Sequence, residues 1–169
     1  MRKSAHAAIA ELEPLTREQF EEWLPRAIAE YAQEHVTGGR WTAREATRKS
    51  REEFDLLLPQ GVASKGHRFF SIVRLPDRKA VGILWIRIEK KPQPSAFIFN
   101  IEIFRSFRRR GYATRAMKLL EQEARRLGLE NIRLHVFGHN HAARPLYEKL
   151  GYVATNIGMR KRLRRAPAK

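Results

Sequence analysis

The sequence predicts a single α/β domain built on a mixed β-sheet, on the basis of three observations. The chain has 169 residues, about the length of one domain. Its 43% hydrophobic and 31% charged residues are typical of a globular protein. Helical and strand patterns alternate only in the second half of the chain. The sheet is therefore expected to combine antiparallel and parallel neighbours.

The first half of the chain is predicted to hold a strand, two helices and a β-hairpin. The helices follow capping boxes that begin at Thr16 and Thr42, where a hydroxyl residue precedes a Gln or Glu by three positions. Pro25 lies inside the first helical pattern and predicts a kink, or a junction of two short helices, because proline lacks the backbone donor. A first strand is expected at residues 9–15. Two strands rich in β-branched and aromatic residues are expected at 68–75 and 80–89, where they form the hairpin.

A further strand, residues 96–104, carries two polar side chains in an apolar sequence. Strict alternation would place Asn100 and Glu102 on one face, together with Ile98 and Phe104. The opposite face would then hold the remaining apolar side chains, Phe97, Phe99, Ile101 and Ile103. A buried strand tolerates polar side chains only when they have partners or a task, so this strand is a candidate for function.

The rest of the chain alternates helix and strand. The patterns predict a helix at 108–127, a strand at 131–137, a helix from 140 to 151 and a last strand at 152–163. Asn140 can cap the second of these helices, and Pro145 within it predicts a bend near Tyr147. We expect residues 1–163 to form the single domain and residues 164–169 to form a basic tail.

Composition excludes several classes of protein. The chain has no cysteine, which excludes disulfides, Cys-ligated zinc and a cysteine nucleophile. No apolar run approaches the roughly 20 residues of a membrane span, and the N-terminus does not resemble a signal peptide, so a cytoplasmic location is expected. The formal charge of +16 fits either a phosphate-bearing partner or a solvated basic surface.

The most informative segment lies where the strand 96–104 gives way to a helix. Three arginines are followed there by Gly111, Tyr112 and Ala113. A helix N-terminus offers unpaired N–H groups and partial positive charge, and small residues let a diphosphate approach the backbone. The patterns G-x-x-x-x-G-K-[ST] and G-x-G-x-x-G are absent, so nucleotide hydrolysis and dinucleotide binding lose support.

Two strings in the sequence resemble motifs of the GNAT superfamily of N-acetyltransferases. FRRRGYATRAM is similar to the R/Q-x-x-G-x-G/A motif that binds the pyrophosphate of acetyl-coenzyme A (acetyl-CoA), and LHVFGHNHAARPLYEKLGY is similar to a second family segment that follows it. The resemblance implies the GNAT fold over nearly the whole chain, a central mixed sheet with splayed parallel strands flanked by helices. It also implies acetyl-CoA as the acyl donor.

The resemblance assigns a set of residues to acetyl-CoA. The pantetheine arm is expected along the backbone of Ile101 and Ile103, and Asn140 is expected to contact that arm or the diphosphate. The diphosphate loop and the helix start behind it would comprise Arg108, Arg109, Arg110, Gly111, Tyr112, Ala113 and Thr114.

The resemblance also suggests the catalytic groups. Tyr147 stands where the family places a tyrosine that gives a proton to the departing thiolate, although its helical spacing also fits a core tyrosine. The base that takes the proton from the amine could be His135, Glu102 or a chain of water molecules. A histidine suits a base near neutral pH because imidazole titrates at about 6.5.

The predicted function is transfer of an acetyl group from acetyl-CoA to a primary amine by direct attack in a ternary complex. Two alternatives stay open: a GNAT-fold sensor of acyl-CoA, and a basic protein that binds nucleic acid without sequence specificity. His135, His139 and His141 lack an accompanying carboxylate pattern, so no metal site is predicted. The expected partners are acetyl-CoA and an amine acceptor, with no specific nucleic acid and no membrane, in a monomer or homodimer. The acceptor itself remains open.

Overall fold

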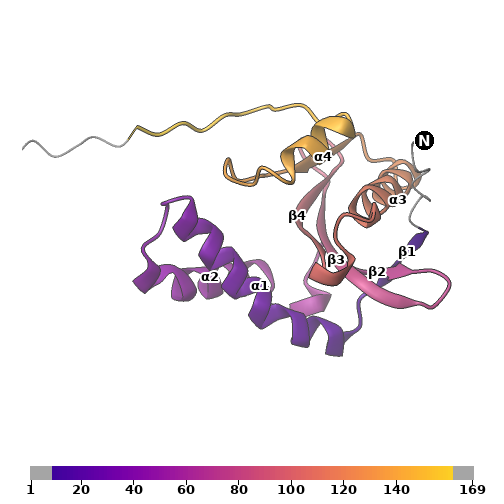
Figure 1. Cartoon of the computed structure of the whole chain (residues 1–169), viewed down its shortest axis with the longest axis horizontal. Coiled ribbons are helices and arrows are strands. Elements are labelled where there is room, and N and C mark those ends of the chain that lie inside the picture. The colour runs from indigo at the N-terminus through magenta and orange to yellow at the C-terminus, as the bar shows by residue number, and fades with distance from the viewer. Residues whose placement is uncertain (1–8, 162–169) are drawn as a thin grey trace, which may run out of the picture.

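The computed structural model describes residues 9–161 as a β-sheet with helices on both faces (Figure 1). The strands are β1 (Ala10–Pro14), β2 (His67–Arg74), β3 (Lys79–Glu89), β4 (Ser95–Ile103) and β5 (Asn131–Leu134). The α-helices are α1 (Arg17–Thr37), α2 (Ala43–Leu57), α3 (Tyr112–Arg126) and α4 (Arg144–Lys149). No helix within these residues is long and apolar enough to cross a membrane.

The strands form one five-stranded sheet in the order β1-β2-β3-β4-β5. The first four strands pair antiparallel with their neighbours, and β5 pairs parallel with β4. Helix α3 supplies the crossover that a parallel pair requires. The predicted mixed sheet is therefore confirmed.

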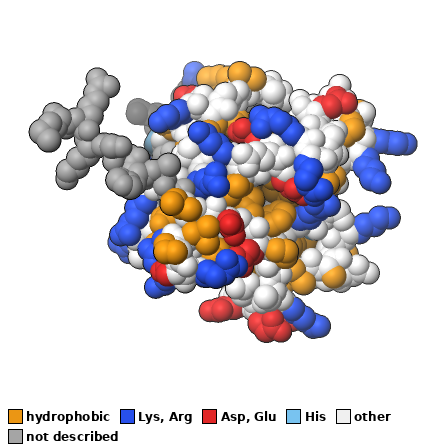
Figure 2. All heavy atoms as spheres, turned by 90° about the vertical axis from the view of Figure 1, so that its right-hand side faces the viewer, with side chains coloured by type: hydrophobic (Ala, Val, Ile, Leu, Met, Phe, Trp, Pro, Cys, Tyr) orange, Lys and Arg blue, Asp and Glu red, His pale blue; other side chains and the backbone are white. Residues whose placement is uncertain are grey.

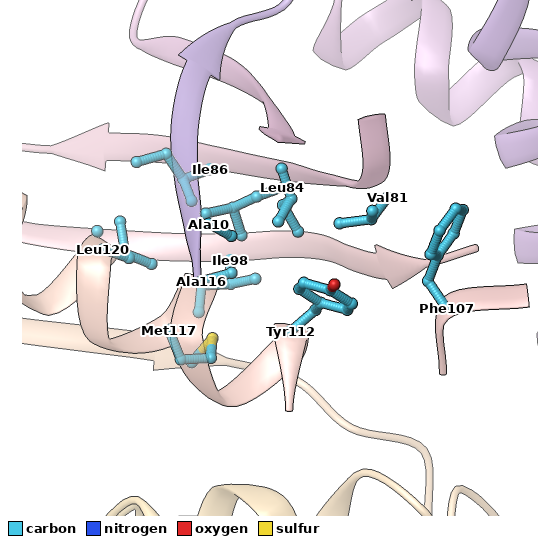
Figure 3. Packing of buried hydrophobic residues seen from close by; sticks show 12 residues of the cluster. Ala10, Val81, Leu84, Ile86, Ile98, Phe107, Tyr112, Ala116, Met117 and Leu120 are labelled. Atoms are coloured by element: carbon cyan, nitrogen blue, oxygen red, sulfur yellow. The ribbon is translucent and has the colours of Figure 1, made fainter. Parts of the chain in front are cut away.

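One face of the sheet packs against α3 (Figure 3). Tyr112, Met117 and Leu120 project from the helix toward apolar side chains of the central strands, among them Leu84 and Ile98. Met117 and Leu84 are completely buried. Burying side chains of this kind stabilises the fold by about 1.5–3 kcal/mol each. This core therefore holds the N-terminus of α3 firmly against the end of β4.

The other face packs against α1 and α2 through a cluster of aromatic rings. Trp23 of α1 meets Phe69 and Trp85 of the sheet edge-on, with ring centroids 5.9 Å apart in both pairs. The ring centre of Phe54 in α2 lies 5.4 Å from that of Trp85. Helices α1 and α2 therefore form a layer that covers this face of the sheet.

Helix α1 begins as predicted but continues through its proline. The capping box is present: Gln19 N–H donates to the Thr16 hydroxyl at 3.2 Å, and Thr16 N–H donates to the Gln19 side chain at 3.0 Å. The expected junction of two helices at Pro25 is wrong, because one helix spans the whole segment. Buried Trp23 and Ala27 hold the helix against the core on both sides of the missing hydrogen bond.

The face assignment along β4 is corrected by a β-bulge. The pairing with β3 shifts between Trp85 and Ile86, so that Phe99 is the extra residue of the bulged strand. Ile98 consequently lies on the α3 face, and Phe99 stacks on Trp85 on the α1 face. Strict alternation placed both residues on the opposite faces, because a bulge reverses the side-chain order beyond it.

The elements after β4 are shorter than their sequence patterns. Helix α3 begins at Tyr112 instead of residue 108, and β5 ends at Leu134 instead of residue 137. Helix α4 begins only at Arg144, so Pro145 lies in the first turn, where a backbone donor has no helical acceptor. Pro145 therefore gives no reason to expect the predicted bend near Tyr147.

The last predicted strand, residues 152–163, is wrong for the part that the structure describes. Residues 152–161 form no strand, because no neighbouring strand within the described chain pairs with them. Isolated strands have no backbone partners and are not stable. Residues 162–163 and the basic tail 164–169 lie outside the described residues.

Candidate active site

The parallel strands β4 and β5 separate after four residue pairs. Their pairing runs from Ser95 opposite Asn131 to Ile98 opposite Leu134, where β5 ends while β4 continues to Ile103. The backbone of residues 99–103 therefore has no strand on that edge. Exposed N–H and C=O groups of this kind can bind an extended ligand as a neighbouring strand would. Ile101 and Ile103 lie in this unpaired half.

The loop that follows β4 has the backbone of an anion-binding turn. Gly111 has φ +84° and Arg109 has φ +62°, so two positions of the loop are left-handed. Gly111 is the N-cap of α3, and no side chain caps that helix end. The first helical hydrogen bond joins Arg115 N–H to Gly111 C=O, so the N–H groups of the first turn have no helical acceptor. Loop and helix start together fit a diphosphate.

The arginines of the loop have separate surroundings. Arg108 folds back toward the strand, and its Nε donates to the Ile103 carbonyl oxygen at 2.9 Å. The guanidinium of Arg110 lies 6.0 Å from the centre of the Phe107 ring. Both side chains keep positive charge beside the start of α3, where it reinforces the attraction of the helix N-terminus for an anion.

A pocket of about 550 Å³ lies between α1 and the end of β4. Its lining residues are Glu22, Arg26 and Glu30 from α1, with Glu102, Phe104, Arg105 and Arg108 from the strand end and loop. Arg108 belongs both to this pocket and to the anion-binding loop. The pocket therefore adjoins the place where a diphosphate fits, and it presents three carboxylates in a strongly basic protein.

Glu102 is the most enclosed charged group of this pocket. Its side chain is only 10% exposed, and its Oε1 forms an ion pair with Arg26. The other oxygen, Oε2, is buried and has no hydrogen-bond partner among the described residues. A buried carboxylate oxygen without a partner among the protein groups is costly and indicates a functional task. Burial and the negative charge of Glu102 also raise the pKa of the nearby Glu30.

The position of Glu102 depends on a glycine in the neighbouring strand. An added Cβ at Gly82 would overlap the backbone carbonyl of Glu102. Gly82→Ala is therefore expected to push β4 away from β3 and to lower the free energy of unfolding by about 1–3 kcal/mol. Gly138→Ala is the control, because an added Cβ there meets nothing within 4 Å. Denaturant titration would contradict this account if both variants unfolded like the parent chain.

Tyr147 lies on α4 and is partly buried against the α3-side core. Its ring centre is 5.7 Å from that of Tyr152. Burial raises the pKa of Tyr147 above the ordinary value for a phenol. The hydroxyl therefore stays protonated across the physiological range and is able to donate a proton.

The structure does not bring His135 into the pocket. His135 is exposed just after β5, and its ring is 5.4 Å from Phe137. Asn140 accepts a hydrogen bond from Ala143 N–H at 3.1 Å, so it caps the turn before α4 instead of the helix itself. The neighbouring His139 pairs with Glu34 of α1, and this contact ties the loop to the layer of α1 and α2.

Sequence reasoning missed the contribution of α1 to the pocket. Glu22, Arg26 and Glu30 recur every four residues, so they form a charged stripe on one side of the helix. That spacing was available in the sequence as a signal. Charged stripes usually face solvent, and only the tertiary structure shows that this one lies opposite Glu102.

The described residues offer no metal centre and no single basic patch on the face that is drawn. Within residues 9–161, no three His, Cys, Asp or Glu side chains are grouped closely enough to hold a metal ion. Figure 2 shows one face of the molecule, on which Lys and Arg side chains are scattered among acidic and apolar ones. Nothing on this face resembles a continuous nucleic-acid surface.

Comparison with known proteins identifies the family. The model of the acetyltransferase (GNAT) family matches residues 11–152. Two proteins of Bacillus subtilis, the uncharacterized N-acetyltransferases YdgE and YycN, are 39% and 38% identical over 153 residues, which are 90% of this chain and 97% of each relative. The chain belongs to the acetyltransferase (GNAT) family, and it is an acetyltransferase.

Solved structures agree with that assignment. The crystal structure of YycN from Bacillus subtilis has a TM-score of 0.89 at 37% identity and covers 93% of this chain and 100% of its own. A more distant structure, AAC(6')-Iy in complex with a coenzyme A bisubstrate analogue, has a TM-score of 0.56 at 16% identity, over 93% of this chain and 99% of its own. The distant likeness shows the shared fold. Enzymes of the GNAT family use acetyl-CoA as their substrate.

Proposed function

We propose that the protein transfers the acetyl group of acetyl-CoA directly to a primary amine bound in the pocket between α1 and β4. The observation that carries this proposal is the continuity of three features. The unpaired half of β4 leads to the anion-binding loop at Gly111, and Glu102 and Arg108 connect that strand and loop to the pocket. A donor held along β4 and an acceptor held in the pocket would meet beside Glu102.

The donor would be held by backbone groups and by the loop. Ile101 and Ile103 lie where the pantetheine amides would find unpaired backbone groups. The N-terminus of α3, with Gly111, Ala113 and Thr114, would bind the diphosphate, and Arg109 and Arg110 would add positive charge. Asn140 stands in the turn before α4 and keeps its proposed contact with the donor arm.

Glu102 is the proposed base. Its partnerless oxygen would take a proton from the substrate ammonium, directly or through water, and the free amine would attack the thioester carbonyl. The carbon–sulfur bond would then break, and the Tyr147 hydroxyl would give its proton to the departing thiolate. The nitrogen would lose its second proton as the amide forms, and that proton would return through water to the phenolate of Tyr147. The ion pair with Arg26 keeps the other oxygen of Glu102 occupied and so fixes the orientation of the carboxylate.

The acceptor is tested with a library of amines. Purified protein and acetyl-CoA are incubated with monoamines, diamines, polyamines, aminoglycosides and peptides, and thiol release is measured. Glu22, Glu30 and Glu102 favour a cationic acceptor, so at least one amine is expected to accelerate thiol release. Failure of every amine, with acetyl-CoA still bound, would favour a sensor of acyl-CoA over an enzyme of this acceptor class.

The choice between the two candidate bases is tested by substitution. Glu102→Gln is expected to lower the transfer rate about 10²-fold or more and to remove the acidic limb of the pH–rate profile, whereas His135→Ala retains both. Glu22→Gln is the matched control, because it removes a carboxylate from the same pocket without touching β4. If His135→Ala alone loses the limb, imidazole is the base. If both variants keep full rate and limb, a water chain is the better account.

A further inference from the structure

The pocket between α1 and β4 divides its charged side chains between two groups of residues. The first, the acidic group, combines three carboxylates with one guanidinium: Glu22, Arg26, Glu30 and Glu102. The second, the basic group, consists of Arg105 and Arg108, which follow β4. The acidic group is therefore net negative and the basic group net positive.

The acidic group has more carboxylates than its arginine can neutralise. Arg26 forms the ion pair with Glu102, and its Nη1 also lies 3.9 Å from Glu30 Oε1, so two carboxylates share one guanidinium. The Glu102 side chain is only 10% exposed, and its Oε2 is buried without a hydrogen-bond partner among the described residues. The ammonium of an acceptor fits at this oxygen, because it supplies both the missing donor and the missing positive charge.

The basic group has the opposite deficit. Arg105 and Arg108 lie one turn apart, since Arg108 N–H donates to the Arg105 carbonyl oxygen at 3.4 Å. Neither guanidinium forms an ion pair with a carboxylate of residues 9–161, and only that of Arg108 has a hydrogen bond there, to the Ile103 carbonyl oxygen. Two neighbouring guanidinium groups without a counter-ion favour an anion, which they can bind through paired N–H donors.

The diphosphate of acetyl-CoA would account for only part of this basic group. Arg108 adjoins the loop that is proposed to hold the diphosphate, so the donor can neutralise it. Arg105 precedes that loop and follows Glu102 by three positions in the sequence. The Cα atoms of Arg105 and Glu102 are therefore at most about 11 Å apart. An amine at Glu102 and a carboxylate at Arg105 can thus belong to one small molecule, for which the pocket of about 550 Å³ has room.

We propose that the acceptor is an amino acid or a short peptide whose own carboxylate is bound by Arg105 while its amine lies at Glu102. This inference rests on the proposed function, because it names the class of amine that the same pocket takes. A diamine or polyamine would bring a second positive charge toward Arg105 and Arg108, and a simple monoamine would leave Arg105 unused. Arg105 is then a specificity-determining residue, which contacts the acceptor and takes no part in the transfer of protons.

The first test compares acceptors that differ only in the carboxylate. Protein amino acids and straight-chain ω-amino acids are each assayed beside their carboxamides with acetyl-CoA, and thiol release is measured. The readout is the ratio of kcat/KM for the acid to kcat/KM for its carboxamide, because a general loss of activity affects both acceptors alike. We expect at least one acid to be preferred by the parent chain, and Arg105→Gln to lower its ratio about tenfold or more. Arg105→Lys keeps the charge and should retain part of the preference.

Arg51→Gln is the matched control for this substitution. Arg51 is an exposed arginine of α2 without an ion pair among the described residues, so its loss changes the net charge equally and should leave the ratio unchanged. Amines without a carboxylate that react as well as the acids would overturn this inference and leave the proposed function intact. An Arg105→Gln variant that loses affinity for acetyl-CoA in calorimetric titration, with an unchanged ratio, would assign Arg105 to the diphosphate instead.

The second test measures binding under conditions in which no transfer can occur. Protein saturated with CoA, which carries no acetyl group, is mixed with the same acids and carboxamides, and binding is detected by saturation-transfer NMR. The preferred acids should bind to the parent chain and to Arg51→Gln but not to Arg105→Gln. Binding that depends on Arg105, together with no thiol release from any amine, would support the carboxylate site and refute the proposed transfer. If no acid binds to the parent chain, the inference is wrong whatever the amine library gives.

Discussion

Gly111→Val is expected to abolish the binding of acetyl-CoA while the protein stays folded. Gly111 is the N-cap of α3 with φ +84°, and the proposed diphosphate approaches the backbone at this residue. A branched side chain would occupy the space of the phosphate oxygens and would also favour a different backbone conformation. Calorimetric titration of the variant with acetyl-CoA should give no binding heat.

The left-handed backbone at Gly111 calls for a control of equal strain. A non-glycine residue in this conformation costs about 1–3 kcal/mol whatever its surroundings. Gly128, at the other end of α3, has φ +67°, and an added Cβ there meets nothing within 4 Å. Gly128→Val should thus lose similar stability and still bind acetyl-CoA. Equal affinities of the Gly111→Val variant and the parent chain would disprove the loop assignment.

Tyr147→Phe is expected to lower the rate constant for transfer about 10²-fold or more, with little change in the affinity for acetyl-CoA. The substitution keeps the packing of the ring and removes only the proposed proton donor. Because burial raises the pKa of Tyr147, the alkaline loss of activity that this phenol causes should lie above pH 10 in the parent chain. Single-turnover rates across pH would measure both effects.

Tyr152 provides the matched control for this substitution. Its ring lies beside that of Tyr147, and its buried hydroxyl has no hydrogen-bond partner among the described residues. Tyr152→Phe therefore removes a phenol from the same neighbourhood, should leave the transfer rate unchanged, and should leave stability equal or slightly higher. If Tyr147→Phe behaves like Tyr152→Phe, Tyr147 is only a core residue.

Local chemistry made much of the fold predictable. The capping box at Thr16, the hairpin of β2 and β3, and the glycine before α3 all follow from contacts between residues close in sequence. The family motifs around Gly111 and Tyr147 indicated acetyl-CoA before any geometry was known. These features are readable because propensity, capping and turn geometry act over a few residues.

Contacts between distant segments decided the rest. The bulge at Phe99 depends on how β4 pairs with β3, and it determines on which faces of the sheet Ile98 and Phe99 lie. The ion pair between Glu102 and Arg26 joins residues 76 positions apart, so no local sequence pattern predicts it. The choice between Glu102 and His135 as the proposed base likewise depends on the tertiary structure, because only Glu102 lines the pocket between α1 and β4.

The sequence by itself determined the class of enzyme and the loop that is proposed to hold the diphosphate. The tertiary structure decided that Glu102 faces α1, that His135 does not line the pocket, and that residues 152–161 pair with no strand of the part of the chain that the structure describes. The physical reason is that helices and turns form from neighbouring residues. A sheet, a pocket or an ion pair between distant residues forms only when segments far apart in the sequence come together.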